Sequence, residues 1–336
     1  MERESINTRT LRAEESIFDF FDLEDEKMKP YANLHLHSTH SDGKYTPEEL
    51  VLMAKAEGYG AIAITDHDTV TANEEIAYYA KKHGLESIFG CEFSVVSMLG
   101  QPADFHFVAF DFDPTYPPMA EYLRGMALRE TDQTRIVFGW AVEKGDIQGI
   151  TWEEVLEYNK GIAWLCNDHV YRAMMAKGLV KAEDYEDWFQ KNFAKQRGLV
   201  PPAYDFLPTE DIIRLVHEAG GIILVAHPYK RLHYMDQLIK LGIDGLEVYH
   251  FSVSPEEQRE ALRIAYEKNL FIAGGSDHEG ALGGMYESFA NPEECPYYAE
   301  PLTFGTMKEH FDELKTRKIG KRAEIPGYIA YKGKQK

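Results

Sequence analysis

Short apolar runs alternate with amphipathic stretches from about residue 31 onward, and this pattern predicts strands alternating with helices. Segment 32–37 alternates leucine with histidine, which is typical of a strand that buries one face. The sequence Thr46-Pro47-Glu48-Glu49 has the form of a capping box with proline at the first helical position, so we expect a helix to about Glu57. Similar patterns predict strands over 61–65, 87–93, 105–110, 221–226, 245–249 and 270–273, and helices over 72–83, 234–241 and 255–268.

This alternation indicates a parallel β/α architecture. The middle of the chain differs, because residues 115–206 are rich in helix formers with apolar side chains at helical spacing and show little strand signal. We therefore expect a barrel formed by residues 31–114 and 207–285, interrupted by a helical insertion over 115–206 that caps the substrate site. Residues 1–30 are expected to be an N-terminal extension and residues 286–336 a C-terminal segment.

Composition and charge limit the partners of this 336-residue chain. A formal net charge of −20 repels nucleic-acid backbones and argues against a DNA-binding face. It leaves room for a phosphate substrate, because bound metal ions can reverse the local field. The three cysteines form no CxxC pair, no apolar run approaches membrane-spanning length, and the N-terminus is too charged for a secretion signal. We expect a cytoplasmic protein without membrane contact.

Polar residues gather where the predicted strands end, which is where parallel barrels carry their chemistry. Thr65-Asp66-His67, Ala226-His227-Pro228 and Ser276-Asp277-His278 each follow an apolar strand. His35 and His37 share one face of their strand and could chelate one ion. Taken singly, each residue has a commoner structural explanation, such as a turn aspartate or a hydrogen-bonded core histidine. A shared metal centre explains them together, because buried polar groups cost free energy unless they are paired or bind metal.

Six segments resemble the motifs of the PHP (polymerase and histidinol phosphatase) family: Leu34-His35-Leu36-His37-Ser38, Ser41-Asp42-Gly43, Thr65-Asp66-His67-Asp68, Gly90-Cys91-Glu92, Ala226-His227-Pro228 and Gly275-Ser276-Asp277. Their order and spacing are closest to the branch with nucleoside 3′,5′-bisphosphate phosphatases and small 5′→3′ RNA exonucleases. The resemblance implies a distorted (β/α)7 barrel that holds two or three divalent ions of Mn, Zn or Fe. The metal ligands that it implies are His35, His37, Asp42, His67, Glu92, His106, His227 and Asp277.

The chain departs from the family pattern at two places. The family usually ends its ligand set with Asp-x-His, whereas this chain has Asp277-His278-Glu279; we expect His278 to bind metal, with Glu279 as the alternative. In the insertion, Asn167-Asp168 precedes His169 where relatives carry Arg-Pro, and a missing arginine removes a bidentate phosphate donor. The remaining substrate-binding candidates are Arg129, Arg135, His169, Lys230 and Arg231.

Together these features predict a metal-dependent phosphoesterase that hydrolyses a small nucleotide-like or sugar-like phosphomonoester with a metal-activated water. The expected catalytic residues are His37, Asp42, His67 and His227. The alternatives are a 5′→3′ exonuclease on short RNA, a histidinol-phosphate-type phosphatase and a non-catalytic metal-binding regulatory module. The acidic charge favours the small substrate over RNA.

Overall fold

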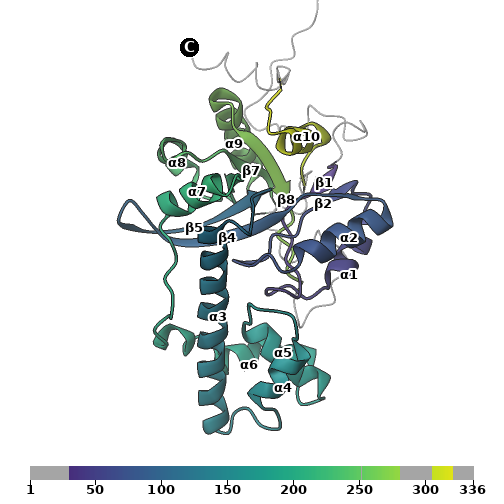
Figure 1. The fold of residues 1–336 in the computed structure, drawn as a ribbon, viewed down its shortest axis with the longest axis vertical. Coiled ribbons are helices and arrows are strands. Elements are labelled where there is room, and N and C mark those ends of the chain that lie inside the picture. Colours follow the sequence, from purple (N-terminus) through teal and green to yellow (C-terminus); the bar gives the residue numbers. More distant parts are fainter. Residues whose placement is uncertain (1–29, 251, 281–304, 321–336) are drawn as a thin grey trace, which may run out of the picture.

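The computed structural model describes residues 30–250, 252–280 and 305–320, and within these residues the strands form two sheets (Figure 1). The smaller sheet is parallel and has the order β1 (Ala32–Asn33), β2 (Ala61–Ile62), β3 (Glu86–Ser87). The larger sheet follows chain order: β4 (Gly90–Met98), β5 (Gln101–Phe110), β6 (Ile222–Val225), β7 (Gly245–His250) and β8 (Phe271–Gly275). The predicted strands are therefore present, with shifted ends.

Strand β5 contradicts the expectation of an all-parallel arrangement. It runs antiparallel to both β4 and β6, whereas β6, β7 and β8 are parallel to one another. The cause is the two-residue turn Leu99-Gly100, which has positive φ at both positions (49° and 72°) and joins the paired residues Met98 and Gln101. A turn this short can only make a hairpin, because a parallel connection needs a crossover of a dozen or more residues.

The two sheets meet at the strand ends that carry the histidines. Leu36 forms an isolated parallel bridge with His278, and His67 forms another with Glu92. The amide of Leu34 also donates to the carbonyl of Gly274 at 3.3 Å. The described strands do not form one closed ladder, so the structure shows a mixed α/β protein and does not confirm the (β/α)7 barrel.

Helices cover the outer faces of both sheets. Two helices, α1 (Pro47–Ala56) and α2 (Asn73–His83), pack on the small sheet; α7 (Thr209–Glu218), α8 (Met235–Leu241) and α9 (Pro255–Lys268) pack on the large one. The predicted capping box of α1 is confirmed, since Thr46 and Glu49 each bond to the other's backbone amide. Another helix, α10 (Lys308–Thr316), is the described part of the predicted C-terminal segment; the predicted N-terminal extension lies almost wholly outside the described residues.

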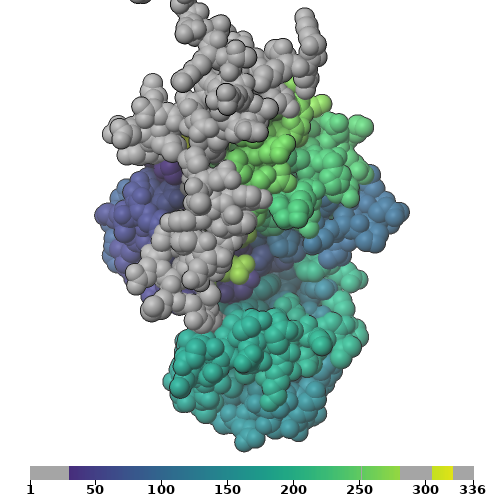
Figure 2. Space-filling view, turned by 180° about the vertical axis from the view of Figure 1, so that it is seen from behind, coloured from purple at the N-terminus to yellow at the C-terminus, as the bar shows by residue number. Residues whose placement is uncertain are grey.

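Four helices between β5 and α7 form a separate lobe, seen at the bottom of Figures 1 and 2. They are α3 (Pro117–Glu143), α4 (Trp152–Tyr158), α5 (Asn167–Ala176) and α6 (Tyr185–Asn192). We call residues 117–200 the cap. The far half of the cap has its own apolar cluster, which includes Val137, Tyr171 and Trp188. In the described part of the chain, no helix is long and apolar enough to cross a membrane.

Candidate metal centre

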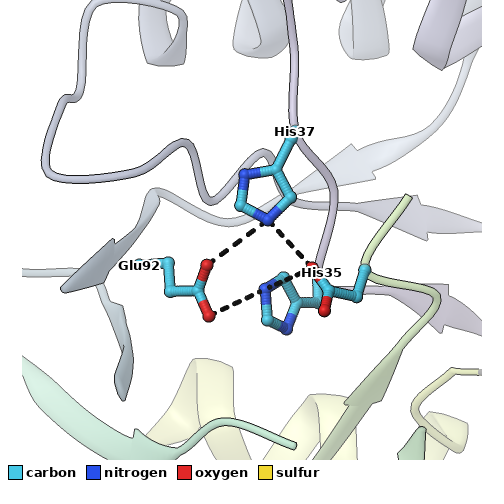
Figure 3. A group of neighbouring side chains, drawn as sticks. His35, His37 and Glu92 are labelled. Atoms are coloured by element: carbon cyan, nitrogen blue, oxygen red, sulfur yellow. Dashed lines mark hydrogen bonds and ion pairs between the residues drawn. The ribbon is translucent and has the colours of Figure 1, made fainter. Parts of the chain in front are cut away.

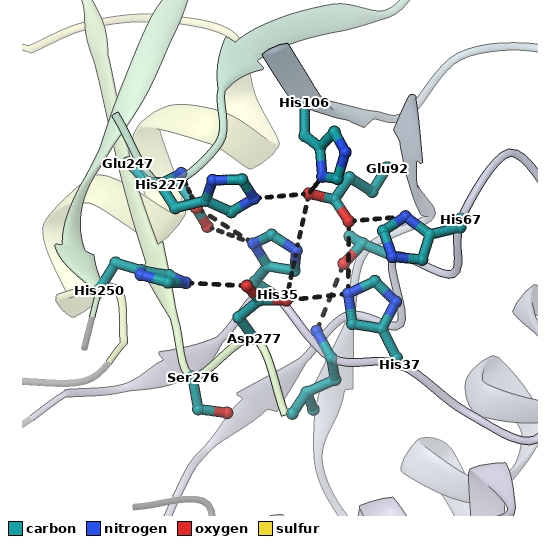
Figure 4. A network of polar contacts seen from close by, with 12 residues as sticks. His35, His37, His67, Glu92, His106, His227, Glu247, His250, Ser276 and Asp277 are labelled. Carbon is teal, nitrogen blue, oxygen red and sulfur yellow. Dashed lines mark hydrogen bonds and ion pairs between the residues drawn. The ribbon is translucent and has the colours of Figure 1, made fainter. Parts of the chain in front are cut away.

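The carboxylate of Glu92 lies at the centre of a ring of imidazoles (Figure 4). Glu92 is fully buried on β4, where only a partnered carboxylate is tolerated. Its oxygens lie 3.1 Å from ring nitrogens of His67, His106 and His227, and 3.3 Å from those of His35 and His37. These residues come from both sheets, so closing the sheets against each other assembles the cluster.

Asp277 and Asp42 add carboxylates on two sides of this ring. Asp277 Oδ1 lies 3.2 Å from His35 Nε2 and 3.0 Å from His37 Nε2 (Figure 4). Figure 3 shows these two histidines beside Glu92. Asp42 lies 3.6 Å from His37 Nδ1 and 3.4 Å from His67 Nε2. Four overlapping groups have ligand atoms within 4.8 Å of one another: His35 with His37, Glu92 and Asp277; His37 with Asp42 and His67; His67 with Glu92 and His106; and His35 with Glu247 and His250. The structure thus brings together all eight residues expected from the motifs.

The chemistry of this donor set fits divalent metal ions. His35 Nε2, His37 Nδ1, His67 Nδ1 and Glu92 Oε2 are buried and make no hydrogen bond within the described residues, although each lies 3.1–3.6 Å from an ion-pair partner in the cluster. Ion pairing without hydrogen bonds compensates the burial of these polar atoms only in part, so a further group that binds them would lower the free energy. A mixed set of imidazole and carboxylate ligands is typical of sites for divalent metal ions.

The charges of the cluster are strongly coupled. Burial disfavours a charged His35, but the carboxylates of Glu247, Asp277 and Glu92 outweigh burial and raise its pKa well above the usual value. Burial likewise opposes ionisation of Glu92, yet the surrounding imidazoles hold the pKa of Glu92 well below its usual range. Metal ions would therefore compete with protons for these nitrogens.

Two further residues of this network, Glu247 and His250, come from β7. The Glu247 oxygens lie 3.0 and 3.1 Å from His35 Nδ1, and one of them accepts the backbone N–H of His227 at 2.7 Å. Glu247 thereby leaves His35 Nε2 facing the centre, as a carboxylate behind a metal-ligating histidine commonly does. His250 Nε2 lies 3.4 Å from Asp277 Oδ2.

Neither Glu247 nor His250 is among the ligands predicted from the sequence, although the sequence contains signals for both. Glu247 is a charged residue inside the apolar strand predicted over 245–249, as Glu92 is inside the strand predicted over 87–93. His250 directly follows that strand, as His67 and His227 follow theirs. The rule that polar residues at strand ends carry the chemistry would have found His250 if it had been applied to every strand.

His278, expected to complete the ligand set, lies in none of the four groups. It pairs in parallel with Leu36, and directly paired residues project to the same face of a sheet. Since His35 and His37 flank Leu36 and point to the opposite face, His278 points away from them and stacks on Tyr45, with ring centroids 5.7 Å apart. Desolvation, with the nearby charges of Asp42 and Asp277, raises the pKa of Glu279 well above its usual value.

A pocket of about 240 Å³ opens beside the metal centre and toward the cap. The centre contributes Asp42, His67 and His106 to its lining, and the cap and the segment that follows it contribute Met126, Arg129, Glu130, Trp164, Arg197 and Phe206; Asp68 and Ser94 complete it. Arg129, one of the predicted substrate-binding residues, therefore lines this pocket. Its guanidinium stacks 4.3 Å from the Phe206 ring centroid and donates to the Tyr204 carbonyl.

The other expected substrate contacts lie elsewhere. Arg135 is exposed and pairs with Asp132 one turn earlier on α3. Arg231 pairs with Asp104 at 2.9 Å, and Lys230 Nζ lies 4.4 Å from the Tyr229 ring centroid. None of these three basic side chains lines the pocket beside the metal centre.

His169 links the cap to the metal-binding loop instead of lining the pocket. Its Nδ1 accepts the Cys166 amide at 3.0 Å, and its Nε2 donates to the Thr39 carbonyl at 3.1 Å. One turn later on α5, the buried guanidinium of Arg172 donates to the carbonyls of Ser41 and Gly43, on either side of Asp42. Backbone groups thus occupy both ring nitrogens of His169, and this placement does not support contact with substrate.

Comparison with known proteins agrees with this geometry. Residues 33–200 match the PHP domain family. The chain is similar to the 5′-3′ exoribonuclease Rnm of Salmonella typhimurium, with 32% identity over 76% of this chain and 87% of that one. It is also similar to a 3′,5′-nucleoside bisphosphate phosphatase of Chromobacterium violaceum, with 26% identity over 80% of this chain and 94% of that one.

Solved structures show the same relationship. A Bifidobacterium adolescentis protein assigned as a metal-dependent phosphoesterase superposes with a TM-score of 0.65 at 26% identity, covering 86% of this chain and 97% of its own. The names of these relatives denote hydrolysis of phosphoester bonds, and this chain is such a hydrolase. With half of its length matching the family and a 32% identical relative along three quarters of it, the chain belongs to the PHP family of metal-dependent phosphoesterases.

Proposed function

We propose that the protein hydrolyses a phosphomonoester of a small nucleotide-like substrate. The observation that carries this proposal is the pocket of about 240 Å³, with metal-binding residues on one wall and Arg129 and Arg197 on the cap side. Its volume is below the roughly 300–1,000 Å³ of common ligand sites, so it suits one phosphorylated unit at a time. Trp164 and Phe206 offer aromatic surfaces on which a base could stack.

The metal ligands in this proposal are the eight residues of the cluster: His35, His37, Asp42, His67, Glu92, His106, His227 and Asp277. Bound ions would supply Lewis-acid chemistry there, polarising the phosphoryl oxygens and lowering the pKa of water. The chain's own residues set the geometry: Glu247 orients His35, and Arg172 and His169 hold the loop around Asp42 against the cap. His37, Asp42, His67 and His227 remain the proposed catalytic group because each faces the centre from a different segment.

We also infer that the two sheets are parts of one distorted barrel. The bridges from Leu36 to His278 and from His67 to Glu92 join their edges at two separate places. This arrangement explains how residues from seven strands and loops face one centre.

A 5′→3′ exonuclease acting on short RNA is the second candidate. The relatives that favour it are the exoribonuclease of Salmonella typhimurium and a Haemophilus influenzae exoribonuclease, which is 32% identical over 75% of this chain and 90% of its own length. An enzyme that releases one 5′ nucleotide at a time would need the same small pocket. The formal charge of −20 favours the smaller substrate.

Product analysis separates the candidates. The purified protein would be supplied in turn with Mn²⁺, Zn²⁺ and Fe²⁺, and then given a nucleoside 3′,5′-bisphosphate, histidinol phosphate or a short 5′-phosphorylated RNA. We expect release of inorganic phosphate from the bisphosphate; release of mononucleotides from the RNA at a higher kcat/KM would favour the exonuclease. Full activity in the metal-stripped protein would refute both candidate functions. Asp42→Asn serves as the inactive control and the exposed Glu143→Gln as the matched active one.

A further inference from the structure

An ion pair that the sequence analysis did not single out lies on the cap side of the pocket. Glu130, on α3, pairs with Arg197, the first residue of a short 3₁₀ helix (Arg197–Leu199), through Arg197 Nη2 and Glu130 Oε2. Both residues line the pocket whose other wall carries Asp42, His67 and His106. We call this pair the cap-side subsite.

The burial of this pair is unequal. The Glu130 side chain is 5% exposed, and its second oxygen, Oε1, is buried without a hydrogen-bond partner among the described residues. Burial raises the pKa of Glu130 to about 7 despite the charge of Arg197. A buried carboxylate with one partner is a poor way to stabilise a fold, since desolvation offsets most of the attraction. The pair therefore calls for an explanation other than stability.

The Arg197 side chain remains 36% exposed and faces the pocket. In the described part of the chain, its guanidinium makes one side-chain hydrogen bond, the one to Glu130. A guanidinium has five N–H donors in a rigid fork, so most of the fork is left for another acceptor. Glu130 fixes the direction of the fork and removes much of the entropy cost of ordering it.

The neighbouring arginines are less suited to bind an anion. Arg129 already donates to the Tyr204 carbonyl and stacks on Phe206. Arg135 lies outside the pocket. Where relatives carry an Arg-Pro pair before the histidine of the insertion, this chain has Asn167-Asp168 and therefore no arginine. Arg197 is therefore the cation of this wall with the largest unused donor capacity.

We propose that Arg197, positioned by Glu130, binds a second anionic group of the substrate, a phosphate or phosphodiester that is not the one hydrolysed. This inference rests on the proposed function, because it assumes that the reacting phosphate lies at the metal ligands on the opposite wall. It narrows the substrate class to nucleotides with two phosphate groups on one unit, or with one phosphate and an adjoining phosphodiester. A sugar monophosphate would leave the subsite unused.

The test compares substrates that differ in the second anion. Kinetics would be measured with a nucleoside 3′,5′-bisphosphate, a 5′-phosphorylated dinucleotide and p-nitrophenyl phosphate, which has one phosphate. For Arg197→Ala we expect KM to rise about 10- to 100-fold for the two substrates that carry a second anionic group, because hydrogen bonds to a charged group are lost. For p-nitrophenyl phosphate, which has a single phosphate, we expect a rise of less than about threefold. A larger effect on the bisphosphate than on the dinucleotide would identify a terminal phosphate as the bound anion, and the reverse a phosphodiester.

Three further variants separate binding from folding. Arg197→Lys keeps the charge without the fork and should recover part of the KM. Glu130→Gln with Arg197→Ala leaves no unpaired buried charge, and it should show the same substrate-dependent KM effect as Arg197→Ala alone. Arg135→Ala, an exposed arginine of the same lobe, should leave all constants unchanged.

Equal effects on all three substrates, or none, would overturn the proposal. If the wild-type protein hydrolyses none of them, the proposed function has failed, and calorimetric binding of the bisphosphate then decides the inference separately. Binding weakened by Arg197→Ala and unaffected by Arg135→Ala would support the subsite, whereas equal affinity in all three proteins would refute it.

Discussion

Replacing Glu92 by glutamine tests the metal centre at its most connected point. The amide has nearly the shape of the carboxylate but lacks the charge that faces five imidazoles at 3.1–3.3 Å. Because Glu92 belongs to two of the four ligand groups, we expect the variant to bind metal at least about 100-fold more weakly, the upper end of what loss of an orienting partner costs. Activity at limiting metal should fall in proportion.

The change in stability follows from linkage. At a free metal concentration 100 times the wild-type Kd, one bound ion stabilises the fold by about 2.7 kcal/mol, and at a concentration equal to Kd by about 0.4 kcal/mol. The variant therefore loses about 2.3 kcal/mol of metal-dependent stability, which corresponds to about 5 °C in Tm at the roughly 2 °C per kcal/mol expected for a long chain.

The assay is thermal unfolding with and without Mn²⁺ or Zn²⁺, combined with metal content after dialysis. The quantity of interest is the gain in Tm on adding metal, since the metal-free variant also loses the attraction between the carboxylate and protonated imidazoles. Glu143→Gln, an exposed glutamate on α3, is the matched control and should behave as wild type. An undiminished Tm gain and unchanged metal content in Glu92→Gln would refute the assignment of the centre.

Two of three further predictions address residues that position the site, and the third addresses an exposed histidine on α7. Arg172→Lys replaces the planar fork that donates to both carbonyls beside Asp42 with a single ammonium group, so metal affinity should fall about 10-fold in a direct titration. The far-UV circular dichroism should stay unchanged, and wild-type metal affinity would show that the cap does not hold this loop. His250→Ala should weaken metal binding about 10- to 100-fold, and an unaltered metal affinity would show that His250 does not contribute to the metal centre. The hydrogen bond to Asp244 raises the pKa of His217, so its contribution is fully present below about pH 6.5 and is lost as pH rises through the raised pKa. Chemical denaturation should show His217→Ala less stable than wild type by about 0.5 kcal/mol at pH 5.5 and by less at pH 9, the small value reflecting solvent exposure; a constant difference would contradict the linkage.

The sequence by itself predicted most of the helices and strands, and the resemblance of its motifs to the PHP family predicted the eight residues that the structure brings together. The helix over 47–56 could be predicted because its capping box and proline are local signals, read within one turn of backbone. A shared site for His67, His227 and Asp277 could be predicted because parallel strands bring their carboxyl ends to one edge, whatever the distance between them in the chain. The histidines at 35 and 37 needed only the two-residue period of a strand to share a face.

Only the tertiary structure decided which faces those residues turn to one another. His278 points to Tyr45 because its backbone pairs with Leu36, and that register is a long-range choice that periodicity does not specify. Likewise, Glu130 and Arg197 are 67 residues apart and share a pocket only because the end of the cap returns against α3. Local patterns set what each segment can be, but the free energy of packing segments together decides which side chains meet, and it depends on contacts that no short window of sequence contains.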